Sequence, residues 1–222
     1  MPKPATSLSP PCPGKAGKLR ALALLLGSLA PLSSHAFVVG ITAGPRSIYL
    51  QVGAGTMTGG FFNAGGVPGN NATINNVTVT VPATNLGGGP RAMTTDSTVT
   101  ASPYDGFTFC TVPAQVYIGG FFRTPGSSAS ANASLSVQAD SALVNAGGQT
   151  IPFNSVSWVS GGNGDATATI PSGTFVGGAS QTLLSVTKNT WFESCLQFNY
   201  ANAQLVPAGT FKGRVIYTMT AP

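Results

Sequence analysis

The sequence predicts an all-β fold, an antiparallel β-sandwich. Three observations support this prediction: short segments of alternating apolar and polar residues, Gly- and Pro-rich turns between them, and the lack of a helical apolar period beyond residue 36. Alternation is typical of antiparallel sheets with one packed and one solvated face. Many short strands joined by such turns are typical of a sandwich or barrel.

The first 36 residues have the pattern of a secretion signal. Residues 1–20 carry basic side chains and no acidic ones, and the apolar run Ala21–Leu32 follows. A small-x-small triplet then ends at Ala36, which predicts cleavage between Ala36 and Phe37. The apolar run is shorter than the roughly 20 residues that a membrane-spanning helix requires. We therefore expect an exported chain without a membrane span.

The mature part, residues 37–222, is expected to form one domain with an N-terminal extension at about 37–45. It contains no histidine, one glutamate and four aspartates. The lack of histidine excludes His-based triads, His zinc sites and imidazole proton shuttles. We accordingly expect no enzyme, no cofactor and no metal. The sequence Gly-Gly-Phe-Phe occurs twice, at Gly59–Phe62 and at Gly119–Phe122. This repeat reflects either a duplication of two halves or chance similarity.

Charge is sparse in the mature part. Six basic and five acidic side chains leave a net charge of +1, so no basic patch remains to bind a nucleic acid. A near-zero net charge also gives little repulsion between copies and favours association.

Strands are expected wherever the period of two is sustained between turn signals. The clearest examples are Ile48–Val52 and Val77–Val81. The further expected strands are Phe107–Val112, Gln115–Phe122, Ser134–Ala139, Thr150–Val159, Thr167–Ile170, Thr182–Thr187, Thr190–Ala201 and Thr210–Thr220.

The segment Thr190–Ala201 has two faces that could be buried. One carries Phe192, Leu196, Phe198 and Tyr200, and the other carries Trp191, Glu193 and Cys195. The alternation does not decide which face lies in the core. A β-bulge near Ser194 would allow both sets to point inward.

Cys110 and Cys195 are the only cysteines of the mature part. An even count in an exported chain predicts a disulfide bond between them. The alternative is a pair of unpaired, buried thiols.

The C-terminal residues carry a family resemblance. After the segment Val206–Phe211, an alternating strand places Phe211, Gly213, Val215, Tyr217 and Met219 on one face. From Glu193 to the C-terminus this pattern resembles bacterial fimbrial subunits, most of all the spore-coat U and archaic chaperone–usher pilin group. The resemblance implies an incomplete immunoglobulin-like sandwich that a donor strand completes. Phe211, Val215, Tyr217 and Met219 would then line the C-terminal pairing strand.

The start of the mature part fits the role of a donor strand. Phe37, Val39 and Ile41 alternate with other residues before Gly44-Pro45 ends the segment. In β-strand addition, backbone hydrogen bonds give affinity and alternate side chains fill pockets. The alternative is that this segment is the first strand of a closed sandwich.

The function implied by the resemblance is a structural subunit of a surface fibre or coat, a bacterial fimbrium reached through the periplasm. Its implied partners are copies of itself or related subunits, a periplasmic chaperone and an usher. The competing hypothesis is a monomeric secreted binding module, an adhesin or lectin-like sandwich.

Overall fold

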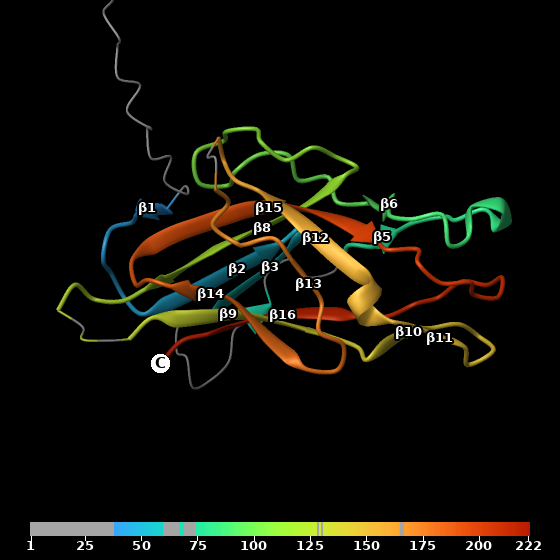
Figure 1. The fold of residues 1–222 in the computed structure, drawn as a ribbon. Coiled ribbons are helices and arrows are strands. Elements are labelled where there is room, and N and C mark those ends of the chain that lie inside the picture. Colours follow the sequence, from blue (N-terminus) through green and yellow to red (C-terminus); the bar gives the residue numbers. More distant parts are fainter. Residues whose placement is uncertain (1–37, 60–66, 69–73, 128, 130, 165–166) are drawn as a thin grey trace, which may run out of the picture. The chain divides into compact units, whose positions relative to one another are not determined.

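The computed structural model describes residues 38–59, 67–68, 74–127, 129, 131–164 and 167–222 (Figure 1). All of them belong to one unit, Ser34–Pro222. The predicted secretion signal and its cleavage site at Ala36 and Phe37 lie outside the described residues.

The strands of the first half of the chain are β1 (Val38–Gly40), β2 (Ser47–Val52), β3 (Gly55–Gly59), β4 (Val67–Pro68), β5 (Val77–Thr78), β6 (Arg91–Ala92), β7 (Thr94–Thr95) and β8 (Gln115–Arg123). Those of the second half are β9 (Ala133–Ala139), β10 (Ala142–Val144), β11 (Thr150–Pro152), β12 (Val156–Gly161), β13 (Gly173–Thr174), β14 (Ser180–Val186), β15 (Thr190–Tyr200) and β16 (Val215–Thr220). Two single 3-10 turns, η2 (Ala83–Asn85) and η3 (Phe153–Ser155), interrupt them.

Two sheets pack against each other. The large sheet has the order β13-β12-β15-β8-β2-β3-β4, and β1 and β6 also pair with β15. The small sheet has the order β14-β9-β16 and lies below the large sheet in Figure 1. Two short pairs, β10-β11 and β5-β7, complete the described strands. This arrangement confirms the prediction of an all-β sandwich.

The core lies between the two sheets. It is built from the inward residues of alternating strands, including Leu50 of β2, Ile118 of β8, Leu135 of β9 and Leu196 of β15. The central strands approach closely at Gly120, where an added Cβ would lie 2.2 Å from the Tyr49 carbonyl oxygen. Only glycine therefore allows β8 to pair this tightly with β2.

Five of the expected strands differ in the structure, among them Thr210–Thr220, whose strand β16 begins only at Val215. Phe107–Val112 forms no strand, and its only ladder contact is the isolated bridge between Ala101 and Thr108. Thr167–Ile170 also lies outside any strand. In Thr150–Val159, η3 separates β11 from β12. Val77–Val81 is reduced to the two residues of β5.

The structure has no β-bulge near Ser194, which was one way for both sets of side chains to point inward. β15 pairs with β8 over Thr190–Ser194 and with β12 over Cys195–Tyr200, and neither ladder shows a register shift. Both faces of β15 are buried instead, because the large sheet is covered on its outer face as well as on its core face.

Candidate functional site

The first candidate site is the edge of β15 where β1 binds. β1 pairs antiparallel with β15 through Val38–Phe192, Val39–Trp191 and Gly40–Thr190. The Ile41 N–H extends the ladder by donating to the Asn189 carbonyl at 2.9 Å. The donor-strand candidates Val39 and Ile41 are half-buried there, while Phe37 lies outside the described residues.

β1 occupies a stretch of β15 that β12 does not reach. The β12 ladder ends at the pair Gly161–Cys195, and β8 covers the opposite edge of β15 over Thr190–Ser194. β1 therefore continues the edge where β12 leaves it, at the upper left of Figure 1. Among the described strands, β1 is the one that pairs with this stretch of the β15 edge.

An apolar row crosses the outer face of the large sheet at the same level. The strand register aligns Tyr49 with Phe121, Phe121 with Trp191, and Trp191 with Val39. Ring centroids are 5.7 Å apart for Tyr49–Phe121 and 6.0 Å for Phe121–Trp191. Aligned apolar side chains on adjacent strands stabilise their pairing. This row, which we call the outer row, thus helps to hold β1 through Val39.

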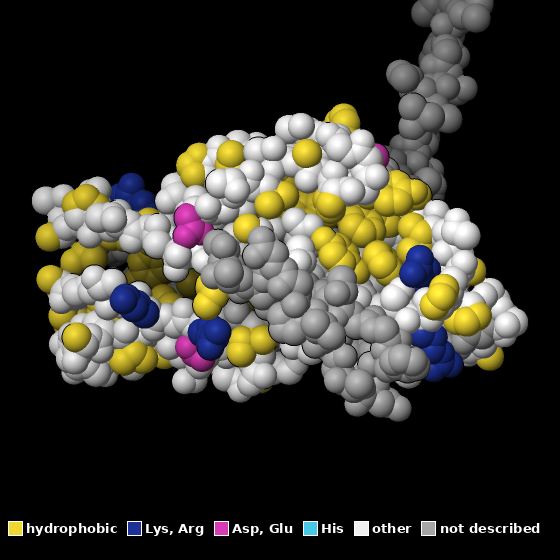
Figure 2. Space-filling view, turned by 180° about the vertical axis from the view of Figure 1, so that it is seen from behind, with side chains coloured by type: hydrophobic (Ala, Val, Ile, Leu, Met, Phe, Trp, Pro, Cys, Tyr) yellow, Lys and Arg dark blue, Asp and Glu magenta, His cyan; other side chains and the backbone are white. Residues whose placement is uncertain are grey.

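The surface near this row is apolar with basic side chains at its margin (Figure 2). Seen from behind, hydrophobic side chains gather toward the end of the unit where β1 lies, with Lys or Arg side chains beside them (Figure 2). Tyr49 and Phe121 are half-buried, and the Arg123 guanidinium carbon lies 5.8 Å from the Phe121 ring centroid.

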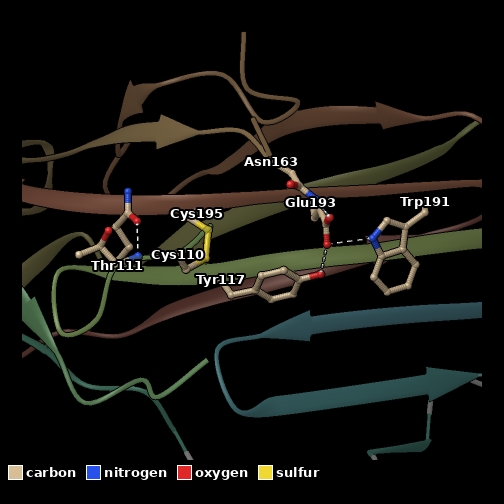
Figure 3. The surroundings of a disulfide bond; sticks show 8 residues. Cys110, Thr111, Tyr117, Asn163, Trp191, Glu193 and Cys195 are labelled. Carbon is tan, nitrogen blue, oxygen red and sulfur yellow. Dashed lines mark hydrogen bonds between the residues drawn. A yellow bond between two sulfur atoms is a disulfide. The ribbon is translucent and has the colours of Figure 1, made fainter. Parts of the chain in front are cut away.

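The second candidate site is a buried carboxylate on the same face of β15. Glu193 is fully buried and accepts three hydrogen bonds. The Tyr117 hydroxyl donates to Oε2 at 2.8 Å, Trp191 Nε1 donates to Oε2 at 3.0 Å, and Asn163 Nδ2 donates to Oε1 at 2.8 Å. Figure 3 shows these side chains converging on the carboxylate. These three hydrogen bonds satisfy the buried carboxyl oxygens and the donors around them.

A disulfide bond lies next to this carboxylate and confirms the predicted pairing of Cys110 with Cys195. The two Cα atoms are 5.5 Å apart, and both cysteines are buried beside the Tyr117 ring (Figure 3). The bond fixes the loop 97–114 to β15, and Tyr104 of this loop stacks on Trp191 with ring centroids 5.6 Å apart. The loop is the cover that buries the outer face.

Burial changes the acidity of the tyrosines. Burial raises the pKa of Tyr117 well above its usual value, and the neighbouring Glu193 carboxylate raises it further. Burial also raises the pKa of Tyr217 well above its usual value. Smaller increases in pKa from burial apply to Tyr49 and Tyr200.

We expect the free energy of unfolding to fall above about pH 10, where exposed tyrosines ionise. Tyr117 and Tyr217 keep their protons in the folded state, while the unfolded chain releases them. Their contribution is therefore complete below pH 10 and is lost at higher pH, by about 1.4 kcal/mol per pH unit for each tyrosine. Urea titrations at increasing pH measure the slope, and Tyr217→Phe should reduce it. An unchanged slope in that variant would contradict the assignment.

The C-terminal strand β16 pairs with β9 from Val215–Ala139 to Thr220–Ser134. Met219 is buried, while Val215 and Tyr217 are half-buried against the core, and the half-buried Phe211 precedes the strand. Among the described residues no strand pairs with the outer edge of β16. β1 pairs with β15 and not with this edge, so the structure does not join the two predicted pairing segments in one ladder.

The sequence did not predict that Tyr117, Asn163 and Glu193 lie together in one site. Their only hint is that Glu193, the single glutamate of the mature part, stands between Trp191 and Cys195 on one face. In the part of the chain that is described, no group of three or more His, Cys, Asp or Glu side chains could hold a metal ion. Nor does this part contain a helix long and apolar enough to cross a membrane.

No family model, curated protein or solved structure matches the chain. Its function is therefore inferred from the sites described above.

Proposed function

We propose that the chain is an exported structural subunit of a surface fibre or coat, assembled by β-strand addition. The observation that carries this proposal is the attachment of β1. Three residue pairs and the Ile41 hydrogen bond connect it to β15, and the connection to β2 is largely exposed. A short strand that completes a sheet edge through so few contacts is suited to exchange between copies.

The unpaired edge of the small sheet supports the same proposal. β16 presents one row of backbone groups that no described strand pairs with, and such an edge is a template for another chain. The other edge strand of this sheet, β14, has a register shift between Thr182 and Leu184. Bulges of this kind disrupt edge pairing, so β16 is the more open edge of the small sheet.

The disulfide and the low charge fit the proposed location and assembly. Disulfide bonds persist in oxidising compartments such as the periplasm or the cell exterior. A mature part with a net charge of +1 has little repulsion between copies. By resemblance, the partners are copies of this chain or related subunits, a periplasmic chaperone and an usher.

The proposal is tested by removing the donor segment. Deleting Phe37–Thr42 from the mature chain should leave a folded monomer that forms no SDS-resistant ladder. Val39→Asp should have the same effect, because it places a charge beside Trp191 in the outer row. Val159→Asp is the matched control, since Val159 is an exposed residue of the same sheet, and this variant should still polymerise.

Size-exclusion chromatography, SDS gels and electron microscopy give the readout. If the intact mature chain stays monomeric at high concentration and with its cognate chaperone, the proposal fails and the binding-module hypothesis takes its place. Unfolding of the deleted chain would show instead that the segment belongs permanently to its own sheet.

A further inference from the structure

We propose that the acceptor for the donated N-terminal segment is the β15 edge of a second copy, so that subunits exchange β1. This inference rests on the proposed function and specifies its interface. The segment Val38–Ile41 of one copy would pair with Asn189–Phe192 of the next. The contacts are those that β1 already makes within its own chain.

The β15 edge provides a complete site for this segment. It supplies a register for three residue pairs, an apolar neighbour for Val39 in Trp191, and a carbonyl acceptor at Asn189 for the Ile41 N–H. The outer row lies on β2, β8 and β15, so most of it remains when β1 leaves.

The acceptor carbonyl is held in place independently of β1. Asn189 adopts a left-handed conformation with φ of 57°. Its N–H donates to the Phe122 carbonyl at 2.6 Å, and its Oδ1 accepts a hydrogen bond from the Thr124 N–H at 2.8 Å. These two hydrogen bonds fix the turn, so the Asn189 carbonyl is already oriented before a donor strand binds. Little conformational entropy is therefore lost at this site on binding.

The connection between β1 and β2 can act as a hinge. Thr42, Ala43, Pro45 and Arg46 are exposed, and the Gly44 N–H donates to the Thr124 carbonyl at 3.3 Å. Extending such a hinge lets β1 reach a neighbour without disturbing β2. When the copy that accepts a strand donates its own β1 to a third copy, the exchange is head-to-tail and extends into a fibre.

After exchange, the β1–β15 contacts are the same, but they form between two copies and no longer within one chain. For a short connection the effective concentration of the tethered strand is on the order of millimolar. We therefore expect monomers at micromolar concentration, and strand exchange as the subunit concentration approaches that range. The β16 edge lacks this advantage, because the chain shows no existing register between it and β1.

Cysteine trapping between two differently labelled copies tests the acceptor edge. Mature Gly40→Cys protein is mixed at high concentration with Thr190→Cys protein and, separately, with Thr218→Cys protein. Gly40 faces Thr190 in the ladder and has open space around its Cβ position, whereas Thr218 is an exposed residue of β16. Exchange at β15 predicts disulfide-linked heterodimers in the first mixture and none in the second. Mass mapping confirms that Cys110–Cys195 stays intact.

The double variant Gly40→Cys/Thr190→Cys completes the test. Its new disulfide closes within one chain, so the oxidised protein should remain monomeric while wild type assembles. Cross-links through Thr218→Cys alone, or fibres without cross-links in either mixture, would overturn exchange at β15 and leave strand addition standing. A wild-type chain that forms no assembly under any of these conditions would refute the proposed function itself.

Discussion

Replacing Cys110 and Cys195 together with alanine is expected to lower the free energy of unfolding by about 4 kcal/mol. The two cysteines are 85 positions apart, so the bond closes a long loop in the unfolded chain and removes much of its conformational entropy. The same bond fixes the loop 97–114 over the outer face. Urea unfolding monitored by circular dichroism measures the loss.

A second readout separates loss of the loop from global weakening. Trp158 and Trp191 are both buried, but only Trp191 stacks on Tyr104 of the covering loop. In a Trp158→Phe background, removing the disulfide should shift the native fluorescence to longer wavelength as Trp191 meets water. A stability loss below about 1 kcal/mol would contradict the entropic argument, and an unchanged spectrum would contradict the role of the disulfide in holding the cover.

Replacing Glu193 with alanine is expected to destabilise the fold by about 3–5 kcal/mol, because it removes the acceptor of three hydrogen bonds, two of them buried. Tyr117 and Trp191 would then be left with unpaired donors where water does not reach, and each such group costs about 1–3 kcal/mol. Thermal and urea unfolding measure the change.

Glu193→Gln is the matched variant. Its side-chain oxygen can still accept from Tyr117 and Trp191, and its amide can donate to Asn163 if the Asn163 amide turns to present its oxygen. We expect this variant to lie within about 1 kcal/mol of wild type. If it were as unstable as the alanine variant, hydrogen bonding at this position would not be the essential feature.

The central strands could be predicted from the sequence because the alternating segments also pair with neighbouring strands over most of their length. Gln115–Phe122, Ser134–Ala139 and Thr190–Ala201 match β8, β9 and β15 within two residues at each end. Phe107–Val112 alternates equally well but has no partner strand. Its backbone instead bonds to Thr100 and Ser102 within the covering loop. Alternation with a period of two shows which side chains share a face. It does not show whether a neighbouring strand is present to pair with.

The sites were less predictable than the strands. The disulfide could be predicted because only two mature cysteines remain. The orientation of β15 could not be predicted from its own sequence. Both of its faces are buried because the loop 97–114 covers the outer face, and the alternation within β15 contains no sign of that loop. The Glu193 cluster joins residues from β8, β15 and the connection after β12, so only the tertiary fold brings Tyr117 and Asn163 to it.

Two backbone amides at the Asn189 turn would report how often β1 leaves the sheet. The amide of Ile41 is protected by the Asn189 carbonyl, whereas the amide of Asn189 is protected by the Phe122 carbonyl. Hydrogen exchange at Ile41 therefore follows each departure of β1, while exchange at Asn189 requires the β8–β15 turn itself to open. The exchange rate of the Ile41 amide then gives the free energy of releasing the strand, and the slower Asn189 amide shows how much of the sheet survives that release.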